Sequence, residues 1–350
     1  MTLVSKLFCN GMTLACITLM LTGCESKQSD STDPVAPVSS LTGDVKIDGS
    51  STVLPISNAI KEKFSEAYPE VNVSVAGSGT GNGFNRFSGK ETDISGASRP
   101  IKPGELEACK EAGIEFIELP VAYDGLTLVI HPENDWVKQL SIEQLKKIFV
   151  GSDAVKKWSD IDPTWPEEDL KIFAPGVGSG TYDYFHEVMA KKDKAELRKD
   201  MTLNEDDNVL VQGVAGNKYS IGFFGVAYFE ENKDKLQAVP IINPSDDTAY
   251  LPTQENIASG KYAPFSRPLL IYVNAASLNN AQVQTLAEYY LQNASETSEQ
   301  VGYVRLPEEV IQRGIANLDA QKTGSHYVDA EGQSRSGSVA DIFVEANRVE

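Results

Sequence analysis

Apolar residues recur along most of the chain with two alternating spacings. Residues 45–47 form a short apolar run, and apolar and polar residues alternate over 71–75, as they do in a half-buried strand. Between these two segments, apolar residues at helical spacing over 56–67 predict a helix that a Tyr-Pro pair ends. The N-terminal part of the globular region therefore reads as strand, helix, strand.

The same alternation continues toward the C-terminus. Further strands are predicted at 94, 114–119, 126–130, 171–174, 221–224 and 269–273, and helical patterns at 84–87, 103–112, 141–149, 181–189, 209–214 and 283–290. Strands that alternate with helices are typical of α/β layers built on a largely parallel sheet. We therefore predict an α/β fold.

The first 24 residues read as an export signal. A basic residue, Lys6, precedes an uncharged segment at 7–21, and the sequence Leu-Thr-Gly-Cys ends at Cys24. A basic start, a short apolar stretch and small residues are typical of a secretory signal peptide, and the ending resembles a bacterial lipobox. We expect cleavage before Cys24 and lipidation of that residue. An ordinary signal peptide and a weak anchor helix are the alternatives.

Residues 25–43 are rich in Ser, Thr, Asp and Pro, and we interpret them as a flexible linker. Such a linker has an r.m.s. reach of roughly 25 Å. After loss of the signal, only Cys109 remains besides the lipidated cysteine, so an internal disulfide is not expected. Cys109 is interpreted as a small packing residue.

Size and charge limit the possible functions. The chain has 350 residues, which favours two domains or one large one, and its formal net charge is −19. So acidic a chain would repel the phosphates of nucleic acid at long range, and no nucleic-acid partner is expected. Any site for an anion must therefore be built locally.

Three loops rich in Gly, Ser and Thr each follow an apolar strand and precede a helix. The first loop is 48–53 (DGSSTV), the second is 77–81 (GSGTG) and the third is 176–181 (GVGSGT). The first N–H groups of a helix have no partner within the helix, and glycine lets the main chain approach a ligand closely. Together with the helix dipole, such loops form an uncharged cradle for an anion. A single loop could be a simple turn, but three in one chain predict an anion site.

A fourth segment, 93–100 (DISGASRP), adds a cation. Arg99 follows a short strand and precedes a proline, which favours an extended backbone. Its guanidinium could grip an oxyanion with two hydrogen bonds. A solvated surface arginine is the alternative interpretation.

Enzyme and metal motifs are not found in the sequence. The segment 83–91 departs from a phosphate-binding P-loop in the spacing of its glycines and in its last residue, and no Gly-x-Ser-x-Gly elbow surrounds Ser78 or Ser179. The three histidines are far apart, and no zinc-ligand spacing is present. We expect neither an enzyme, nor a metal site, nor a cofactor.

The four segments, in order and with their spacing, resemble the PstS-like phosphate-binding proteins of bacterial phosphate ABC importers. The resemblance covers about 44–273. It implies a two-lobed periplasmic-binding-protein fold of type II, with crossover hinge strands near 119–124 and 265–272. Lobe I would then comprise 44–119 and 266–350, and lobe II would comprise 120–265.

The resemblance also implies a function, a location and partners. Inorganic phosphate would bind between the lobes and pass to the membrane permease of an ABC importer. The protein would be an exported, lipid-anchored monomer facing the periplasm or lying at the cell surface. A binder of another oxyanion or of a phosphate ester, and a surface lipoprotein that senses phosphate, are the alternatives.

Carried over by residue, the resemblance implies a set of ligand contacts. The residues implied are Ser51, Thr52 and Val53 of the first loop, Ser78 of the second, and Ser179, Gly180 and Thr181 of the third, to which we add Arg99. Two departures from the family pattern stand out: Pro175 replaces an arginine, and Arg99 replaces an aspartate. Since phosphate keeps a proton that sulfate lacks, a carboxylate acceptor is expected, and Asp124 is our candidate for it.

Overall fold

The computed structural model describes residues 41–335 and 337–349, apart from the side chain of Lys192. The strands are β1 (Gly43–Gly49), β2 (Val71–Val75), β3 (Ile94–Ala97), β4 (Phe116–Ile130), β5 (Lys171–Pro175), β6 (Thr202–Asn204), β7 (Ser220–Gly225), β8 (Gln237–Ala238), β9 (Ile241–Ile242), β10 (Ala249–Tyr250) and β11 (Ser266–Asn274). The α-helices are α1 (Leu54–Ala67), α2 (Thr80–Ser88), α3 (Pro103–Glu111), α4 (Ile142–Phe149), α5 (Gly180–Met189), α6 (Asp207–Ala215), α7 (Val226–Glu231), α8 (Gln254–Ala258), α9 (Ala281–Gln300), α10 (Glu308–Asp319) and α11 (Val339–Ile342). Short 3-10 turns lie at η1 (Trp158–Asp160), η2 (Lys191–Asp193), η3 (Ala275–Asn279) and η4 (Glu345–Asn347). The predicted signal segment with Cys24, and most of the predicted linker, lie outside the described residues.

A mixed nine-stranded sheet organises the described chain, and β9 pairs with β10 in a separate two-stranded sheet. Its strand order is β2-β1-β3-β11-β4-β7-β5-β6, with β8 paired to β4. We call β2-β1-β3-β11 with the beginning of β4 the first half of the sheet, and the end of β4 with β7-β5-β6 the second half. Parallel pairs lie on the flanks of the sheet, whereas β4 and β11 run antiparallel to their neighbours. The α/β prediction is confirmed, but the sheet is less parallel than the alternation of elements predicted.

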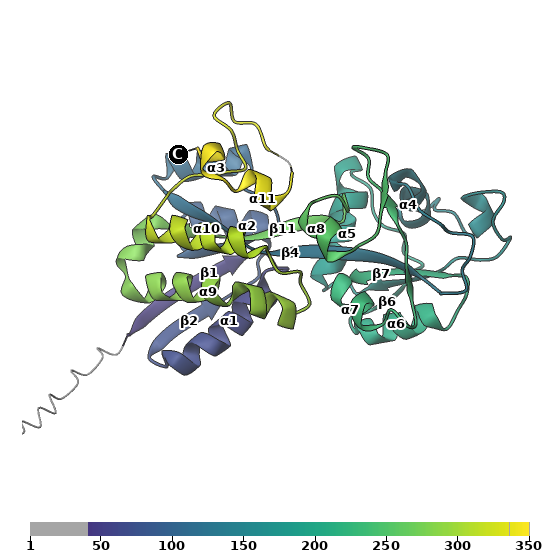
Figure 1. Ribbon diagram of the computed structural model, residues 1–350, viewed down its shortest axis with the longest axis horizontal. Helices are drawn as coiled ribbons and strands as arrows, with labels where there is room; N and C mark the ends of the chain where they lie inside the picture. Colours follow the sequence, from purple (N-terminus) through teal and green to yellow (C-terminus); the bar gives the residue numbers. More distant parts are fainter. Residues whose placement is uncertain (1–40, 336, 350) are drawn as a thin grey trace, which may run out of the picture. The chain divides into compact units, whose positions relative to one another are not determined.

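One long strand, β4, replaces two predicted ones. Fifteen residues are extended without a break, and all of them are buried. The apolar runs at 114–119 and 126–130 are its two ends, joined by a segment that contains Asp124 and Gly125. Strand β11 pairs with β4 along most of this length, with a register shift at Leu269 and Leu270. Figure 1 shows β4 and β11 running side by side between the two halves.

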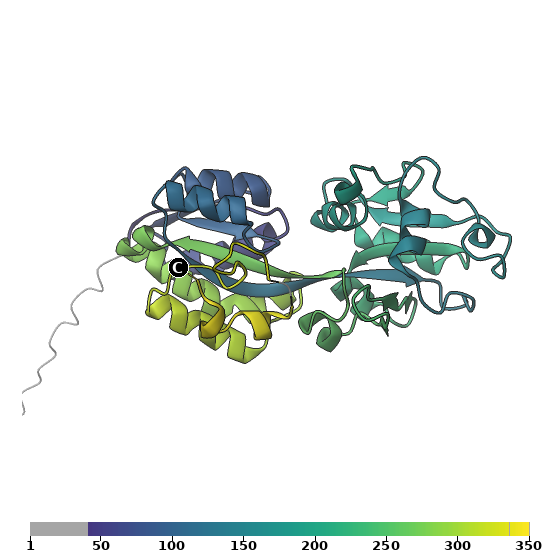
Figure 2. The same ribbon diagram turned by 90° about the horizontal axis from the view of Figure 1, so that it is seen from above.

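Helices cover both faces of the sheet. In the first half, α1, α9 and α10 pack together on one face, and α2 and α3 pack on the other. Figure 2 shows α9 and α10, in green and yellow, and the blue helices on opposite sides of the strands. In the second half, α6 packs its apolar side on β5 and β7, and α4 and α5 lie together on the opposite face. The core is therefore a three-layer arrangement in each half.

Glycine is required where α2 meets β1. A Cβ at Gly83 of α2 would lie 2.5 Å from the Cα of Gly49, which itself has a φ of +146°. Helix α2 thus approaches the end of β1 backbone to backbone. By contrast, a Cβ at Gly81 of the same helix would meet nothing within 4 Å.

These two glycines make a matched pair for a stability test. Gly83→Ala is expected to lower the free energy of unfolding by about 1–3 kcal/mol, since the backbone of β1 must move to admit the methyl group. Gly81→Ala is expected to raise it by up to about 1 kcal/mol, because alanine loses less entropy in a helix. Urea unfolding followed by circular dichroism measures both, and equal effects of the two substitutions would contradict the packing argument.

A buried carboxylate ties the C-terminal segment to the sheet. Glu118 of β4 is 1% exposed and accepts hydrogen bonds from the hydroxyls of Tyr272 and Ser325, both at 3.0 Å. It also accepts from the backbone N–H of His326 at 2.7 Å and lies 3.2 Å from Nδ1 of that imidazole. A buried charge is tolerated only when donors surround it, and here they come from β11 and from the segment after α10.

All three tryptophans of the chain lie in the second half. Trp158 packs against Trp136 and Trp165, with ring centroids 5.7 and 5.8 Å apart. Its indole N–H donates to the carbonyl of Tyr219, next to β7. The cluster thus lies against the beginning of β7.

Cys109 is a packing residue, as predicted. It is fully buried among the apolar side chains of α2, α3 and β11. Burial, together with nearby Glu105, raises the pKa of its thiol to about 11. The thiol is therefore protonated at physiological pH.

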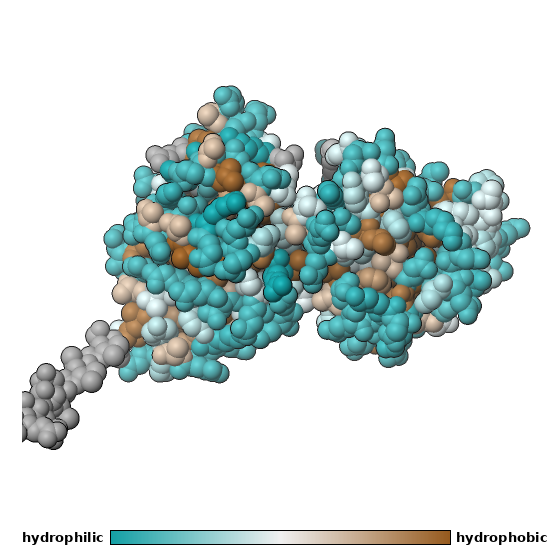
Figure 3. All heavy atoms as spheres, in the orientation of Figure 1, coloured by the Kyte–Doolittle hydropathy of each residue, from teal (hydrophilic) through white to brown (hydrophobic). Residues whose placement is uncertain are grey.

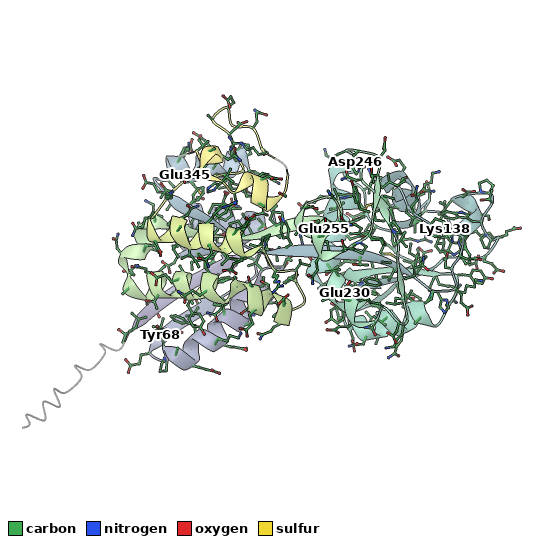
Figure 4. All side chains as sticks on the ribbon, in the orientation of Figure 1. Tyr68, Lys138, Glu230, Asp246, Glu255 and Glu345 are labelled. Atoms are coloured by element: carbon green, nitrogen blue, oxygen red, sulfur yellow. The ribbon has the colours of Figure 1, made fainter. Side chains whose placement is uncertain are left out.

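Polar and charged side chains dominate the surface seen in Figure 3, with scattered apolar patches between them. Glu345, labelled in Figure 4, lies in the C-terminal segment and pairs with Lys322 and Arg348. Hydrogen bonds from these two cations lower its pKa to about 2. Within 41–335 and 337–349, no helix has both the length and the apolar character that a bilayer crossing requires.

Candidate functional site

A polar cavity of about 520 Å³ collects residues from the predicted loops. Its lining residues come from the first loop, from the start of α2, from the segment around Arg99, from α5 and from β11, namely Ser50, Ser51, Thr52, Gly79, Thr80, Gly81, Asn82, Ser98, Arg99, Lys102, Glu105, Asp183, Tyr184, His186, Glu187, Lys191 and Arg267. We call it the loop pocket. The first and second loops and Arg99 thus lie around one space, on elements of both halves of the sheet.

Hydrogen bonds within the first loop fix its conformation. The hydroxyl of Ser50 accepts the backbone N–H of Thr52 at 3.1 Å, and its carbonyl accepts the backbone N–H of Val53 at 3.1 Å. Val53 itself is buried in the core, and its N–H, the predicted donor to the ligand, is used within the loop. Ser51 and Thr52 line the loop pocket.

Asp48 links the first loop to the second. One of its carboxylate oxygens accepts the backbone N–H groups of Gly49 and Ser78, at 2.7 and 3.0 Å, and the other pairs with the Arg86 guanidinium. Burial raises the pKa of Asp48, but hydrogen bonds from Ser78 and Gly49 and the charge of Arg86 outweigh burial, so its pKa is lowered. The carboxylate therefore stays ionised and holds the two loops together.

The second loop differs from the prediction in detail. Ser78 is exposed and gives its backbone N–H to Asp48, and it is absent from the lining of the loop pocket. Its neighbours from Gly79 to Asn82 line the pocket instead. Here the hydroxyls of Thr80 and Ser98 lie 3.1 Å apart. The hydroxyls of this side of the pocket thus come from Thr80 and Ser98.

The third loop approaches the first closely at Gly180. A Cβ at Gly180 would lie 3.0 Å from Oγ1 of Thr52, which is tighter than ordinary van der Waals contact. Ser179 is the N-cap of α5, and its hydroxyl accepts the backbone N–H of Thr181 at 3.2 Å. These three predicted residues lie beside the loop pocket without lining it, and α5 contributes later side chains instead.

Glu205 shapes the start of the third loop. Its carboxylate accepts the backbone N–H of Gly178 at 3.2 Å. A Cβ at Gly176 would overlap the same carboxylate, with 2.0 Å between the two. Gly176 thus lies directly against an acidic side chain from the segment after β6.

Arg267 of β11 is the cation at the centre of the cluster. Its Nη2 donates to the hydroxyl of Thr52 at 3.0 Å, and Nε and Nη2 donate to one oxygen of Asp124 at 3.0 and 2.9 Å. Its guanidinium lies over the ring of Tyr184, 3.6 Å from the ring centroid. The chain thus places a nearly buried cation where the first loop, β4 and α5 meet.

Asp124 supports this arginine. It is 3% exposed, faces Arg267 across the β4–β11 ladder and does not line the loop pocket. Burial raises the pKa of its carboxyl, and the charge of Arg267 opposes that rise. A carboxylate in this position fixes the guanidinium in place.

Arg99 lines the loop pocket but is already paired. Its Nη1 and Nη2 donate to the two carboxylate oxygens of Glu105, at 2.8 and 2.6 Å. The ring of Phe84 lies under its guanidinium. The sequence analysis therefore identified Arg99 but missed Arg267, the cation that contacts the first loop. The only signal for Arg267 was a charged residue at the start of an apolar run in the predicted return crossover.

A second cavity of about 550 Å³ lies elsewhere in the first half. Its lining includes the end of α3, the start of β4 and η3. None of the predicted loops contributes to it, so we place the candidate site in the loop pocket. Among the residues the structure describes, no group of three or more His, Cys, Asp or Glu side chains could hold a metal ion.

Comparison with known proteins gives consistent matches. Residues 34–294 match the PBP superfamily domain. The chain is 43% identical over 314 residues to protein SphX of Synechococcus elongatus, covering 89% of this chain and 91% of that protein. It is 39% identical to the phosphate-binding protein PstS of Staphylococcus haemolyticus, covering 79% and 86% of the two chains.

A solved structure resembles the described fold. The crystal structure of a possible phosphate binding protein from Planctomyces limnophilus is 42% identical in sequence, with a TM-score of 0.77. The match covers 81% of this chain and all of that one. The predicted two-lobed architecture is confirmed by this likeness.

Proposed function

The chain belongs to the PBP superfamily, in the family that contains SphX and PstS, and on that basis we propose that it binds inorganic phosphate for an ABC importer. The family consists of extracytoplasmic binding proteins and not of enzymes. The observation that carries the proposal is Arg267, which reaches the Thr52 hydroxyl from the strand that pairs with β4.

The chemistry of the loop pocket suits a small oxyanion. Arg267 supplies positive charge in a chain whose net charge is −19. Hydroxyls of Ser51, Thr52, Thr80 and Ser98 supply uncharged donors around it. A hydrogen bond to a charged group contributes roughly 1.5–3 kcal/mol, and micromolar binding requires only about −8.2 kcal/mol. A modest set of donors is therefore sufficient, even after the cost of ordering the site.

We propose that the ligand contacts extend across the predicted loops. The proposed set is Ser51, Thr52, Ser78, Arg99, Ser179, Gly180 and Thr181, to which Arg267 is added. Val53 is left out of the set, because its N–H donates to the carbonyl of Ser50. Asp124 takes the role of a positioning residue for Arg267, because its accepting oxygen is used by the guanidinium. The contact between Gly180 and Thr52 supports a ligand held jointly by the first and third loops.

The proposed lobes are 44–119 with 266–350, and 120–265. Each lobe carries its own hydrogen-bond donors to phosphate. The ligand would therefore bind most tightly when the donors of both lobes face it. Phosphate would then shift the population toward a closed form, which the permease could recognise.

Export and anchoring form part of the proposal. The sequence 21–24 (LTGC) supports lipidation of Cys24. The linker at 25–43 would then hold a monomer near the membrane, facing the periplasm or the outside of the cell.

The volume of the loop pocket favours one alternative ligand class. A cavity of about 520 Å³ lies within the range of pockets that hold drug-sized ligands. Lys102 and Lys191 also line it, away from the central arginine. A phosphate ester is therefore the second candidate.

Calorimetry on protein freed of bound phosphate tests the proposal. Phosphate is expected to bind with micromolar or tighter affinity, and sulfate at least 100-fold more weakly. Glycerol phosphate serves as the representative ester in the same series. Absence of binding heat with phosphate would remove the proposal, and tighter binding of glycerol phosphate would replace it with the alternative.

A further inference from the structure

The loop pocket differs in charge from the chain as a whole. With a formal net charge of −19, the overall field of the chain repels an approaching anion and slows its association. Charges of both signs line the loop pocket instead, namely the cations Arg99, Lys102, Lys191 and Arg267 and the carboxylates Glu105, Asp183 and Glu187. The charge that an incoming anion meets therefore depends on which of these side chains are already paired.

Carboxylates neutralise the two arginines of the pocket. Arg99 donates hydrogen bonds to both carboxylate oxygens of Glu105. Nη2 of Arg267 lies 2.9 Å from Oδ2 of Asp124, and its Nη1 lies 3.9 Å from Oε2 of Glu187. The fields of such close pairs largely cancel at a distance, so the arginines attract an anion mainly once it is inside the pocket.

The two lysines of the lining are not neutralised in this way. Lys102 is the residue before α3 in the first half, and Lys191 begins η2 after α5 in the second half. Both residues are exposed, and neither forms an ion pair with a carboxylate among the residues that the structure describes. The remaining carboxylate of the lining, Asp183, lies in the first turn of α5, where the positive end of the helix dipole offsets its charge.

Screening by salt makes the location of these lysines decisive. Exposed charges separated by more than about 8 Å are largely screened from each other at physiological ionic strength. An anion close to the pocket therefore responds mainly to the charges of the lining, and less to the acidic surface beyond it. The unpaired lysines thus provide local attraction on an acidic molecule.

We propose that Lys102 and Lys191 are steering residues, which raise the rate at which phosphate enters the loop pocket without contacting the bound ligand. One lysine comes from each half, so the attraction acts on an anion that approaches between them. Arg267 and the hydroxyls of the pocket then hold the ligand. The inference rests on the proposed function and adds a kinetic role for cations that the proposed ligand contacts do not use.

The test measures rates on a double variant, Lys102→Gln with Lys191→Gln. Calorimetry on phosphate-free protein gives the dissociation constant, and release of radiolabelled phosphate into excess unlabelled phosphate gives the dissociation rate. The ratio of the two values gives the association rate. This rate is expected to fall about 5–10-fold at about 20 mM salt but less than about 2-fold at about 500 mM, because salt screens the attraction. The dissociation rate is expected to stay within about 2-fold of the wild type.

A second double variant, Lys90→Gln with Lys138→Gln, is the matched control. It removes the same charge, also with one lysine from each half. Lys90 follows α2 at the end away from the loop pocket, and Lys138, labelled in Figure 4, lies outside the lining. Its association rate is expected to stay within about 2-fold of the wild type at both salt concentrations.

Three outcomes would overturn the inference. Faster dissociation with an unchanged association rate would show that Lys102 and Lys191 contact the bound ligand. Equal slowing of association in the two double variants would show that only the net charge matters, and unchanged rates in both would show that neither lysine pair acts on entry. Absence of phosphate binding by the wild-type protein would instead refute the proposed function itself.

Discussion

Replacement of Arg267 by Gln is expected to weaken phosphate binding by at least about 100-fold, which corresponds to two lost contacts from a charged donor. Arg267 carries a positive charge next to the first loop, and its position is fixed by Asp124, Thr52 and Tyr184. The glutamine side chain is shorter than that of arginine and carries no charge, so it cannot replace these contacts. Calorimetric titration with phosphate measures the loss.

The control for this variant addresses folding. Arg267→Gln alone leaves the Asp124 carboxylate buried without a cation, which destabilises the fold. The double variant with Asp124→Asn removes both charges together and keeps similar shapes. Arg305→Gln, at an exposed ion pair with Glu299, is expected to bind as the wild type does. A folded double variant with wild-type affinity would show that the central cation is not a ligand contact.

The largest effect on stability is expected from Glu118→Ala. The free energy of unfolding should fall by about 3–5 kcal/mol, because the substitution leaves several buried donors without an acceptor. The hydroxyls of Tyr272 and Ser325 and the imidazole of His326 all lose their partner. Denaturant unfolding followed by circular dichroism measures the change.

A surface glutamate provides the comparison. Glu296 pairs with Lys63 at 3.1 Å and has a side chain that is 67% exposed. Its replacement by Ala is expected to change the free energy of unfolding by less than about 1 kcal/mol. Similar losses for the two variants would mean that the buried network contributes no more than a solvated ion pair.

Much of the fold followed from local pattern. The helices at 141–149 and 181–189 and the strand at 71–75 carried clear periodicity, and the structure has them within a few residues. Strand β4 was split in the prediction, because Asp124 and Gly125 interrupt its apolar character. Only pairing with β11 shows that this polar segment is buried strand. The antiparallel centre of the sheet is a tertiary property that the spacing of apolar residues does not encode.

The site was predictable where glycine and hydroxyl residues form a motif. The first and second loops and Arg99 lie around one pocket, as their order in the chain suggested. Arg267 carries no motif, since it is a single charged residue in an ordinary strand. Its place in the pocket depends on the β4–β11 register. Whether the predicted loop residues contact phosphate stays a prediction.

The tryptophan cluster gives the protein a built-in optical reporter for one part of the molecule. Since Trp136, Trp158 and Trp165 all lie in the second half, indole emission would follow the melting of that half alone. Damage limited to the Glu118 network would then leave the emission spectrum unaltered until the second half also unfolds. Comparison of that signal with one from the whole backbone would reveal whether the two halves unfold as one cooperative unit.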